Sequence, residues 1–367
     1  IGLEAEETMK LTRTFLENVP HKELYDGETS IYDFARIAFG GVIRLVEHFR
    51  CAPDIISFSN NLCYQGEIKP LREENSVVLS PHVVPHRIDG GRVDDAKVNL
   101  VEAQTVASLV CAAIEQPEYA YNEFNQPMTF GISSLLGDQQ AGEIEKILHA
   151  KLAPEVYLRR QILCGNPAHF QGDERDVMFL SMVDSPTGGP MPLRDPEANK
   201  RIFKKRYNVA ASRARDQMWL VYSLNHETDL KPGDIRRSFI EYAIDPKAKE
   251  REIERYKGKT ESPFEERVLR HLISRGYSVQ PQYRVGAYRI DLVVTGGGKR
   301  LAVECDGEQW HGHDKLQEDM ERQAILERLG WQFVRIRGSV FFRDPDRAMA
   351  PVFRRLEELS IPVGEQA

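Results

Sequence analysis

The sequence lacks the features of several simple classes of protein. Its 367 residues include only five cysteines, which are scattered and form no Cys-x-x-Cys pair. This excludes a disulfide framework and a common zinc motif, so we expect reduced thiols. No segment approaches the roughly 18 uninterrupted apolar residues of a membrane helix. The start, Ile1–Glu7, is acidic rather than a basic leader. We therefore expect a cytoplasmic protein with no membrane partner.

An excess of positive charge is also absent. The formal net charge is -7 at pH 7, which excludes a protein that coats nucleic acid by bulk attraction. Any contact with nucleic acid must use local basic patches. Internal repeats and low-complexity tracts are absent too. The length suffices for two or three domains, and the opening segment, which begins with Ile1, reads like the middle of a domain. We therefore hypothesise a longer parent polypeptide.

Apolar runs of strand length alternate with helical patterns in the first two thirds of the chain. We predict strands at 76–79, 129–133, 156–164, 176–183 and 217–222, and helices at 54–64, 99–115 and 140–151. This alternation is typical of a parallel sheet covered by helices. We predict an α/β domain at 41–243, preceded by a helical lead-in at 1–40.

A charged segment at 244–261 separates this domain from the rest of the chain. Its composition fits a flexible linker or a continuous charged helix, and both separate two cores. The remaining residues, 262–367, predict a small αβββαβ domain with a closing helix. Its predicted elements are a helix at 263–275, strands at 279–285, 288–294 and 300–305, a helix at 314–329, a strand at 331–337 and a helix at 344–359.

Two carboxylates mark this second domain. Asp291 interrupts an apolar strand, and the next strand ends in Glu304-Cys305-Asp306. The turn Gly296–Lys299 between them predicts an antiparallel hairpin that brings Asp291 and Glu304 to one edge. Carboxylates with water and substrate phosphate hold Mg²⁺, so the pattern suits metal-assisted phosphodiester hydrolysis.

These carboxylates and their surroundings resemble the PD-(D/E)xK nuclease superfamily, and within it the domain related to very-short-patch-repair (Vsr-like) endonucleases. The segments that match are Ser262-Pro263-Phe264-Glu265, Arg289–Val294, Val303–Gly307, Trp310-His311-Gly312-His313, Asp319-x-x-Arg322 and Gly330-Trp331.

The resemblance implies a role for each matched residue. Asp291 and Glu304 would bind Mg²⁺ or Mn²⁺, with the Cys305 carbonyl as a further ligand. Glu265 would complete the acidic site, and His311 would position or protonate near the scissile phosphate.

Asp306 departs from the family pattern. It stands where the superfamily has Lys and the repair enzymes have His, which leaves the base or charge-stabilising group open. The alternative interpretation is a non-catalytic, regulatory DNA-binding fragment with a degenerate site.

Three segments of the larger domain lie at predicted element junctions, where ligands bind in α/β sheets. They are Glu47–Pro53, Phe170–Asp176 and Arg206–Arg215. In this order they resemble motifs IV, V and VI of superfamily 1 helicases, and Gly131–Ser134 with Gln139 resembles the strand and loop between them.

That resemblance implies the second RecA-like motor domain. Arg50 and Arg213 would act as arginine fingers on the γ-phosphate of ATP. Glu174 would contact the ribose, and Gln171 and Gly172 would shape the loop. The residues implied to touch the nucleic-acid backbone are Ser134, Asn166 and His169.

The sequence holds no Walker A loop. Gly296–Lys299 lacks the residue spacing of a Walker A loop and the Ser or Thr that follows its Lys. A Walker B acidic pair is also missing, because Val101–Gln104 has no Asp before its Glu. We therefore expect an ATP site only together with a first RecA-like domain, the missing N-terminal helicase partner. The sequence thus predicts the C-terminal part of a helicase-nuclease. DNA is the expected substrate because the nuclease resemblance is to DNA enzymes, and RNA is the alternative. Whether the nucleic acid is single- or double-stranded, and whether the protein acts in DNA repair or in defence, stays open.

Overall fold

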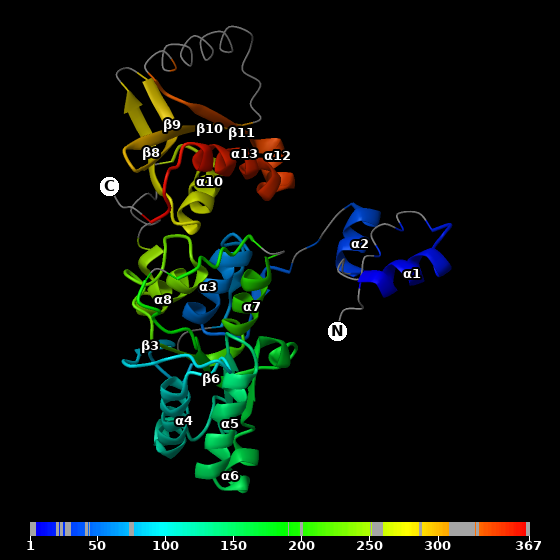
Figure 1. Cartoon of the computed structure of the whole chain (residues 1–367). Helices are drawn as coiled ribbons and strands as arrows, with labels where there is room; N and C mark the ends of the chain where they lie inside the picture. Colours follow the sequence, from blue (N-terminus) through cyan, green and yellow to red (C-terminus); the bar gives the residue numbers. More distant parts are fainter. Residues whose placement is uncertain are drawn as a thin grey trace. The chain divides into compact units, whose positions relative to one another are not determined.

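The structure is a computed structural model that divides into two compact units, residues 1–46 and 47–367 (Figure 1). It describes residues 5–19, 22, 25, 31–40, 43, 45–72, 77–189, 191–198, 201–249, 251, 260–285, 288–307, 327 and 330–364. The first unit contains helices α1 (Ala5–Phe15) and α2 (Ile31–Phe39). In the part of the chain that the structure describes, no helix combines the length and apolar character that crossing a membrane requires.

A five-stranded parallel sheet forms the centre of the larger unit's first domain. The strand order is β3 (Val83–Arg87), β7 (Ala214–Tyr222), β6 (Arg175–Ser181), β4 (Phe130–Ser134) and β5 (Leu163–Gly165). Every neighbouring pair is parallel. The predicted parallel α/β fold is therefore confirmed.

Helices cover both faces of this sheet (Figure 1). Helices α3 (Pro53–Cys63), α7 (Ile202–Ala210) and α8 (Ile235–Ile244) pack on one face, and α4 (Leu100–Glu115) and α5 (Gln139–Lys151) pack on the other. Along β6, Met178 and Leu180 enter the first core, whereas Val177 and Phe179 enter the second. Because both faces are buried, β6 reads as a continuous apolar run without alternation.

Short elements complete this domain. They are strands β1 (Glu47–His48) and β2 (Lys69–Pro70), helix α6 (Pro154–Arg159) and the 3-10 helices η3 (Pro117–Tyr119) and η4 (Pro167–Phe170).

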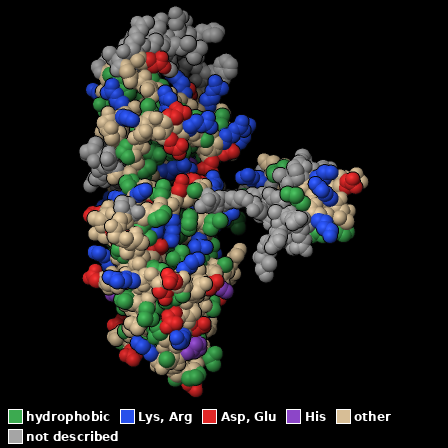
Figure 2. Space-filling view, viewed as in Figure 1, with side chains coloured by type: hydrophobic (Ala, Val, Ile, Leu, Met, Phe, Trp, Pro, Cys, Tyr) green, Lys and Arg blue, Asp and Glu red, His purple; other side chains and the backbone are tan. Residues whose placement is uncertain are grey.

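On the face that Figure 2 shows, Lys and Arg side chains lie among Asp and Glu side chains rather than in one continuous band.

Two strand predictions in this domain are wrong. The run at 156–164 is mostly helix α6 and a turn, because Pro154 at the first helical position starts a helix before β5. Residues 77–79 form no strand. The sheet instead uses β3, and its central Pro85 is tolerated because β3 lies at the edge of the sheet.

The second domain is a four-stranded mixed sheet with helices on one face. Its strand order is β11 (Phe333–Arg337), β10 (Lys299–Asp306), β9 (Tyr288–Gly296) and β8 (Ser278–Val285). β8, β9 and β10 pair antiparallel, and β10 pairs with β11 in parallel. Helices α10 (Pro263–Ser274), α12 (Gly338–Arg343) and α13 (Pro345–Glu358) contribute buried side chains to the main core.

The element order predicted for this domain is confirmed wherever the structure describes it, and α12 is an addition. The helix predicted at 314–329 lies outside the described residues, apart from Glu327. The small α/β domain with a restriction-endonuclease-like order of elements thus follows the parallel-sheet domain, as the sequence indicated.

Candidate functional site

The hairpin of β9 and β10 brings the two predicted carboxylates together. Its register runs from Lys299 opposite Gly296 to Val303 opposite Leu292, and Gly297 and Gly298 take the positive φ angles (57° and 70°) that glycine adopts without strain. Beyond the last pair, the amide of Cys305 donates to Asp291 Oδ2 at 2.8 Å. Asp291 is therefore held against the backbone next to Glu304, as the hairpin prediction required.

The charges of four carboxylates act on the Cys305 thiol. Burial raises the pKa of this thiol well above its ordinary value, and the charges of Asp291, Glu265, Glu304 and Asp306 raise it further. Glu304 is only 4% exposed. We call these four residues the acidic cluster. Negative charges gathered in a partly buried place are costly unless a cation compensates them.

Glu265 has a structural task at the start of α10. Its carboxylate accepts hydrogen bonds from the Ser262 hydroxyl at 2.9 Å and from the Glu261 amide at 2.9 Å. The Ser262 hydroxyl in turn accepts from the Glu265 amide at 3.1 Å. This resembles a capping box, which satisfies amides at a helix start. The predicted catalytic role of Glu265 therefore coexists with a capping role.

Gln282 is a member of the site that the sequence pattern missed. Its side-chain amide donates to Glu265 Oε2 at 2.9 Å. The β8–β9 register pairs Pro281 with Leu292 and Tyr283 with Ile290, so Gln282 lies across from Asp291 between these two pairs. Its φ of 52° is uncommon for a residue other than glycine. Its only signal in the sequence is a polar residue within a strand.

Arg335 brings positive charge to the acidic cluster. Its guanidinium donates to Asp306 Oδ1 at 3.0 Å, and the parallel register places Arg335 beside Glu304. Asp306, at the position of the family's Lys or His, therefore lies in an ion pair. The sequence did not single out Arg335, because parallel pairing joins segments that are far apart in the chain.

The donor set suits a hard divalent cation. Among the described residues, no group of three or more His, Cys, Asp or Glu side chains is arranged to hold a metal ion. However, Mg²⁺ needs only one or two carboxylates when water and substrate phosphates complete its shell. Asp291 and Glu304 fit that requirement. The predicted residue His311, with Trp310, His313, Asp319 and Arg322, lies outside the described residues.

The helicase-like motif residues meet at the amino ends of β6 and β7. Arg50 Nε lies 2.5 Å from Glu174 Oε2, and Arg50 Nη1 donates to the Ser212 carbonyl at 3.5 Å. Arg213 Nη1 donates to the Asp173 carbonyl at 3.5 Å. Burial and then the charge of Arg50 lower the pKa of Arg213, which places the two predicted finger residues in one electrostatic neighbourhood.

Two further arginines organise this neighbourhood. Arg72 is 8% exposed, donates to the carbonyls of Arg50 at 3.0 Å and Arg215 at 2.8 Å, and lies 2.5 Å from Asp216. Arg215 lies 3.5 Å from Glu174. The sequence did not reveal Arg72, because its partners are all distant in the chain. It fixes the backbone that carries Arg50 and Arg215.

The loop between η4 and β6 contains the predicted loop-shaping pair. Gln171 and Gly172 are exposed. Gly172 has a φ of 86°, and a Cβ on it would meet no atom within 4 Å. Its conformation, rather than a lack of space, therefore favours glycine.

The residues predicted to touch nucleic acid lie at the opposite, carboxyl end of the sheet. Ser134 is fully buried, and its hydroxyl accepts from the Leu136 amide at 3.3 Å. Asn166 and His169 cap η4: the Asn166 side chain accepts from the Ala168 amide at 2.7 Å, and the Asn166 amide donates to His169 Nδ1 at 3.1 Å. Their role toward nucleic acid stays a prediction.

Comparisons with known proteins match both domains. A model of the AAA domain family (AAA_12) matches residues 34–225, and the restriction-endonuclease-like family REase_MTES_1575 matches residues 264–356. A similar solved structure is the C-terminal domain of a possible DNA helicase from Lactobacillus plantarum WCFS1, at 13% identity and a TM-score of 0.28, covering 52% of this chain and 96% of that chain. No curated protein matches the sequence. Because the first model spans more than half of the chain, the chain belongs to the AAA domain family, with a superfamily 1 helicase-like domain followed by a restriction-endonuclease-like domain.

Proposed function

We propose that this chain is the nuclease-bearing, C-terminal part of a helicase-nuclease, and that its second domain hydrolyses DNA phosphodiester bonds with Mg²⁺ or Mn²⁺. The observation that carries the proposal is the hydrogen bond from the Cys305 amide to Asp291 Oδ2 at 2.8 Å, which holds this carboxylate beside the strand end that bears the buried Glu304. Two neighbouring carboxylates in a buried place are costly without a compensating cation. The restriction-endonuclease-like family match supports it.

The residues of the site divide the work. Asp291 and Glu304 would hold the metal, and the Cys305 amide keeps Asp291 in position. When bound, the metal would supply a Lewis acid for the phosphate and a water of lowered pKa. Arg335, held by Asp306, offers a guanidinium that suits a phosphate anion. Glu265 is oriented by Ser262, and His311 would serve proton transfer.

The AAA domain would complete an ATP site only with a first RecA-like domain. Arg50 and Arg213 share one neighbourhood with Glu174, which fits charge stabilisation in phosphoryl transfer. The sequence supplies no Walker A lysine for the phosphates. The motor of the full protein would then feed nucleic acid to the nuclease.

A second candidate is a DNA-binding domain without catalysis. The observation in its favour is Asp306, whose negative charge replaces the positive group of the family pattern. Arg335 answers this objection only in part, because its guanidinium is engaged with Asp306 itself.

Calorimetric titration of Mn²⁺ into the chain separates the two candidates. The active-site proposal predicts one site that Asp291→Asn weakens at least tenfold. Glu266→Gln is the matched control, because Glu266 lies on α10 but pairs with Arg270 at 2.8 Å on the surface. Equal Mn²⁺ binding by wild type and Asp291→Asn contradicts the proposal and favours the second candidate.

A further inference from the structure

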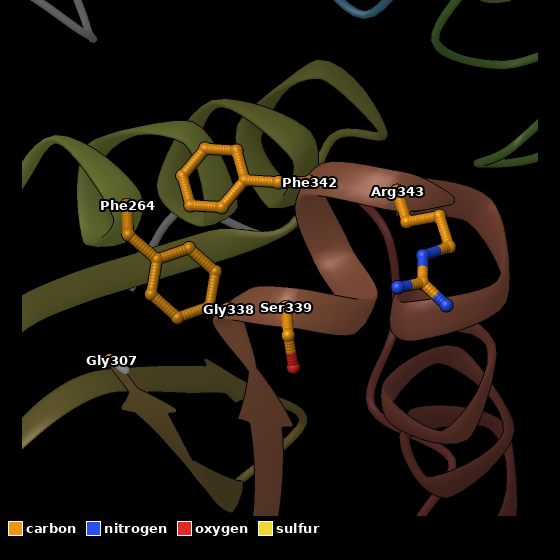
Figure 3. A pocket seen from close by; sticks show the side chains of 6 residues that line it. All are labelled: Phe264, Gly307, Gly338, Ser339, Phe342 and Arg343. Atoms are coloured by element: carbon orange, nitrogen blue, oxygen red, sulfur yellow. The ribbon is translucent and has the colours of Figure 1, made fainter. Parts of the chain in front are cut away.

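A pocket of about 450 Å³ opens beside the acidic cluster. It is lined by Phe264, Gly307, Gly338, Ser339, Phe342 and Arg343 (Figure 3). Two chain connections place it next to the proposed reaction site. Gly307 follows Asp306 at the end of β10, and Phe264 precedes Glu265 in α10. Two residues that line the pocket are therefore chain neighbours of two members of the acidic cluster, Asp306 and Glu265.

The floor of the pocket is aromatic. The ring centres of Phe264 and Phe342 lie 5.6 Å apart, and Phe341 meets both at 5.3 and 5.9 Å. Phe264 and Phe341 are buried in the core, whereas Phe342 is 57% exposed. Figure 3 shows the Phe264 and Phe342 rings close to each other, above the strand end with Gly307. The two buried phenylalanine rings thus support the Phe342 ring, which is exposed to solvent.

The rim of the pocket is cationic. Arg343 of α12 lines the pocket, and the guanidinium of Arg267, which is not one of the lining residues, lies 5.4 Å from the centre of the Phe342 ring. No acidic side chain is among the described residues that line it. The pocket therefore joins an aromatic face to positive charge immediately beside a cluster of negative charge.

We propose that this pocket binds an unpaired nucleobase of a single-stranded nucleic acid whose backbone passes the acidic cluster. Each base offers a π face that stacks on an exposed aromatic ring. Arg267 and Arg343 suit the flanking phosphates. The volume lies within the range of small-ligand pockets. The inference rests on the proposed nuclease function and assigns it a substrate class, a strand that is single at the point of cutting.

Photo-crosslinking locates the base directly. The full chain is mixed with a thymidine oligonucleotide that carries 5-iododeoxyuridine, with EDTA present so that no metal is needed, and the adduct is mapped by mass spectrometry. The proposal predicts an adduct on Phe342. Adducts confined to other parts of the chain, or none at all, overturn it.

Affinity measurements give an independent test. By fluorescence anisotropy in EDTA, Phe342→Ala is expected to weaken oligonucleotide binding about tenfold, the range of one stacked base, while Phe342→Tyr retains it. Phe39→Ala is the control, because Phe39 is 84% exposed and lies in the other unit. Gly307→Leu adds an apolar side chain at a residue that lines the pocket, where a Cβ would meet no atom within 4 Å, and is expected to match Phe342→Ala.

The outcomes separate this inference from the nuclease proposal. Unchanged affinity in both pocket variants refutes the base pocket, even if the chain cuts DNA. Weakened affinity in Phe342→Ala, together with absent cleavage by wild type, supports the pocket and refutes the nuclease. Equal cutting of single-stranded and fully paired DNA by wild type, unaltered by Phe342→Ala, also contradicts the pocket.

Discussion

His271 gives the second domain a calculable sensitivity to acid. This histidine of α10 is 5% exposed and lies edge-on to Phe341, with ring centres 5.6 Å apart. Burial lowers its pKa from 6.5 to about 4, against a smaller opposing effect of Asp346. As the pH falls below 6.5, the unfolded chain binds a proton that the folded chain refuses until about pH 4. Stability is therefore complete above pH 6.5 and declines as the pH falls toward 4.

The magnitude follows from the two pKa values. A shift of the pKa from 6.5 to about 4 lowers the free energy of unfolding by about 3 kcal/mol once the pH is below both values. Between pH 8 and pH 5 the loss is about 2 kcal/mol. His271→Leu removes the titration. At pH 8 the free energy of unfolding of the variant is expected to equal that of wild type within about 1 kcal/mol. At pH 5 it is expected to be higher than that of wild type by about 2 kcal/mol.

Urea denaturation at pH 5, 6.5 and 8 measures this difference. Pulsed hydrogen exchange of peptides from α10 (Pro263–Ser274) restricts the readout to the second domain. His149→Leu serves as control, because His149 is exposed on α5 in the other domain. If wild type and His271→Leu lose stability in parallel between pH 8 and pH 5, the reasoning from burial is refuted.

Three further predictions concern the AAA domain. Asp234→Ala removes the carboxylate that lies 2.7 Å from the Arg236 guanidinium, which is 1% exposed. Urea denaturation is therefore expected to show a free energy of unfolding about 3–5 kcal/mol lower than that of wild type. A decrease below about 1 kcal/mol would contradict a stabilising role of the pair. Burial raises the pKa of Glu102 from 4.5 to about 7, so the domain's stability should fall as the pH rises between those values, and Glu102→Gln should abolish the decline; an unchanged slope contradicts it. The chain alone should show no steady ATP turnover in a coupled assay, and turnover that Arg213→Ala abolishes would overturn the proposed need for a first motor domain.

Much of the fold could be predicted from the sequence because its strongest patterns are local. Helix α4 begins after Asn99, whose side chain accepts the Glu102 amide at 3.2 Å, and its apolar spacing sets its face. The hairpin of β9 and β10 follows from glycines at its turn. The strand predicted at 156–164 failed because apolar content alone does not separate strand from helix, and Pro154 decided between them.

The site was predictable only where its residues belong to contiguous motifs. Asp291, Glu304 and Glu265 belong to such motifs, and the structure joins Asp291 to the Cys305 amide, next to Glu304. Arg335 and Arg72 lie outside these motifs. Their importance comes from parallel pairing and from carbonyls of remote segments, and such contacts leave no local pattern in a single sequence.

The most direct test of the account is cleavage of supercoiled plasmid and labelled single-stranded DNA by the chain with Mg²⁺ or Mn²⁺, comparing wild type, Glu304→Gln and Glu266→Gln. Glu304 is a buried member of the acidic cluster, whereas Glu266 pairs with Arg270 on the surface. The account predicts metal-dependent cleavage by wild type and Glu266→Gln and its loss in Glu304→Gln. Cleavage that survives in Glu304→Gln, or no cleavage by wild type with either metal, would contradict it.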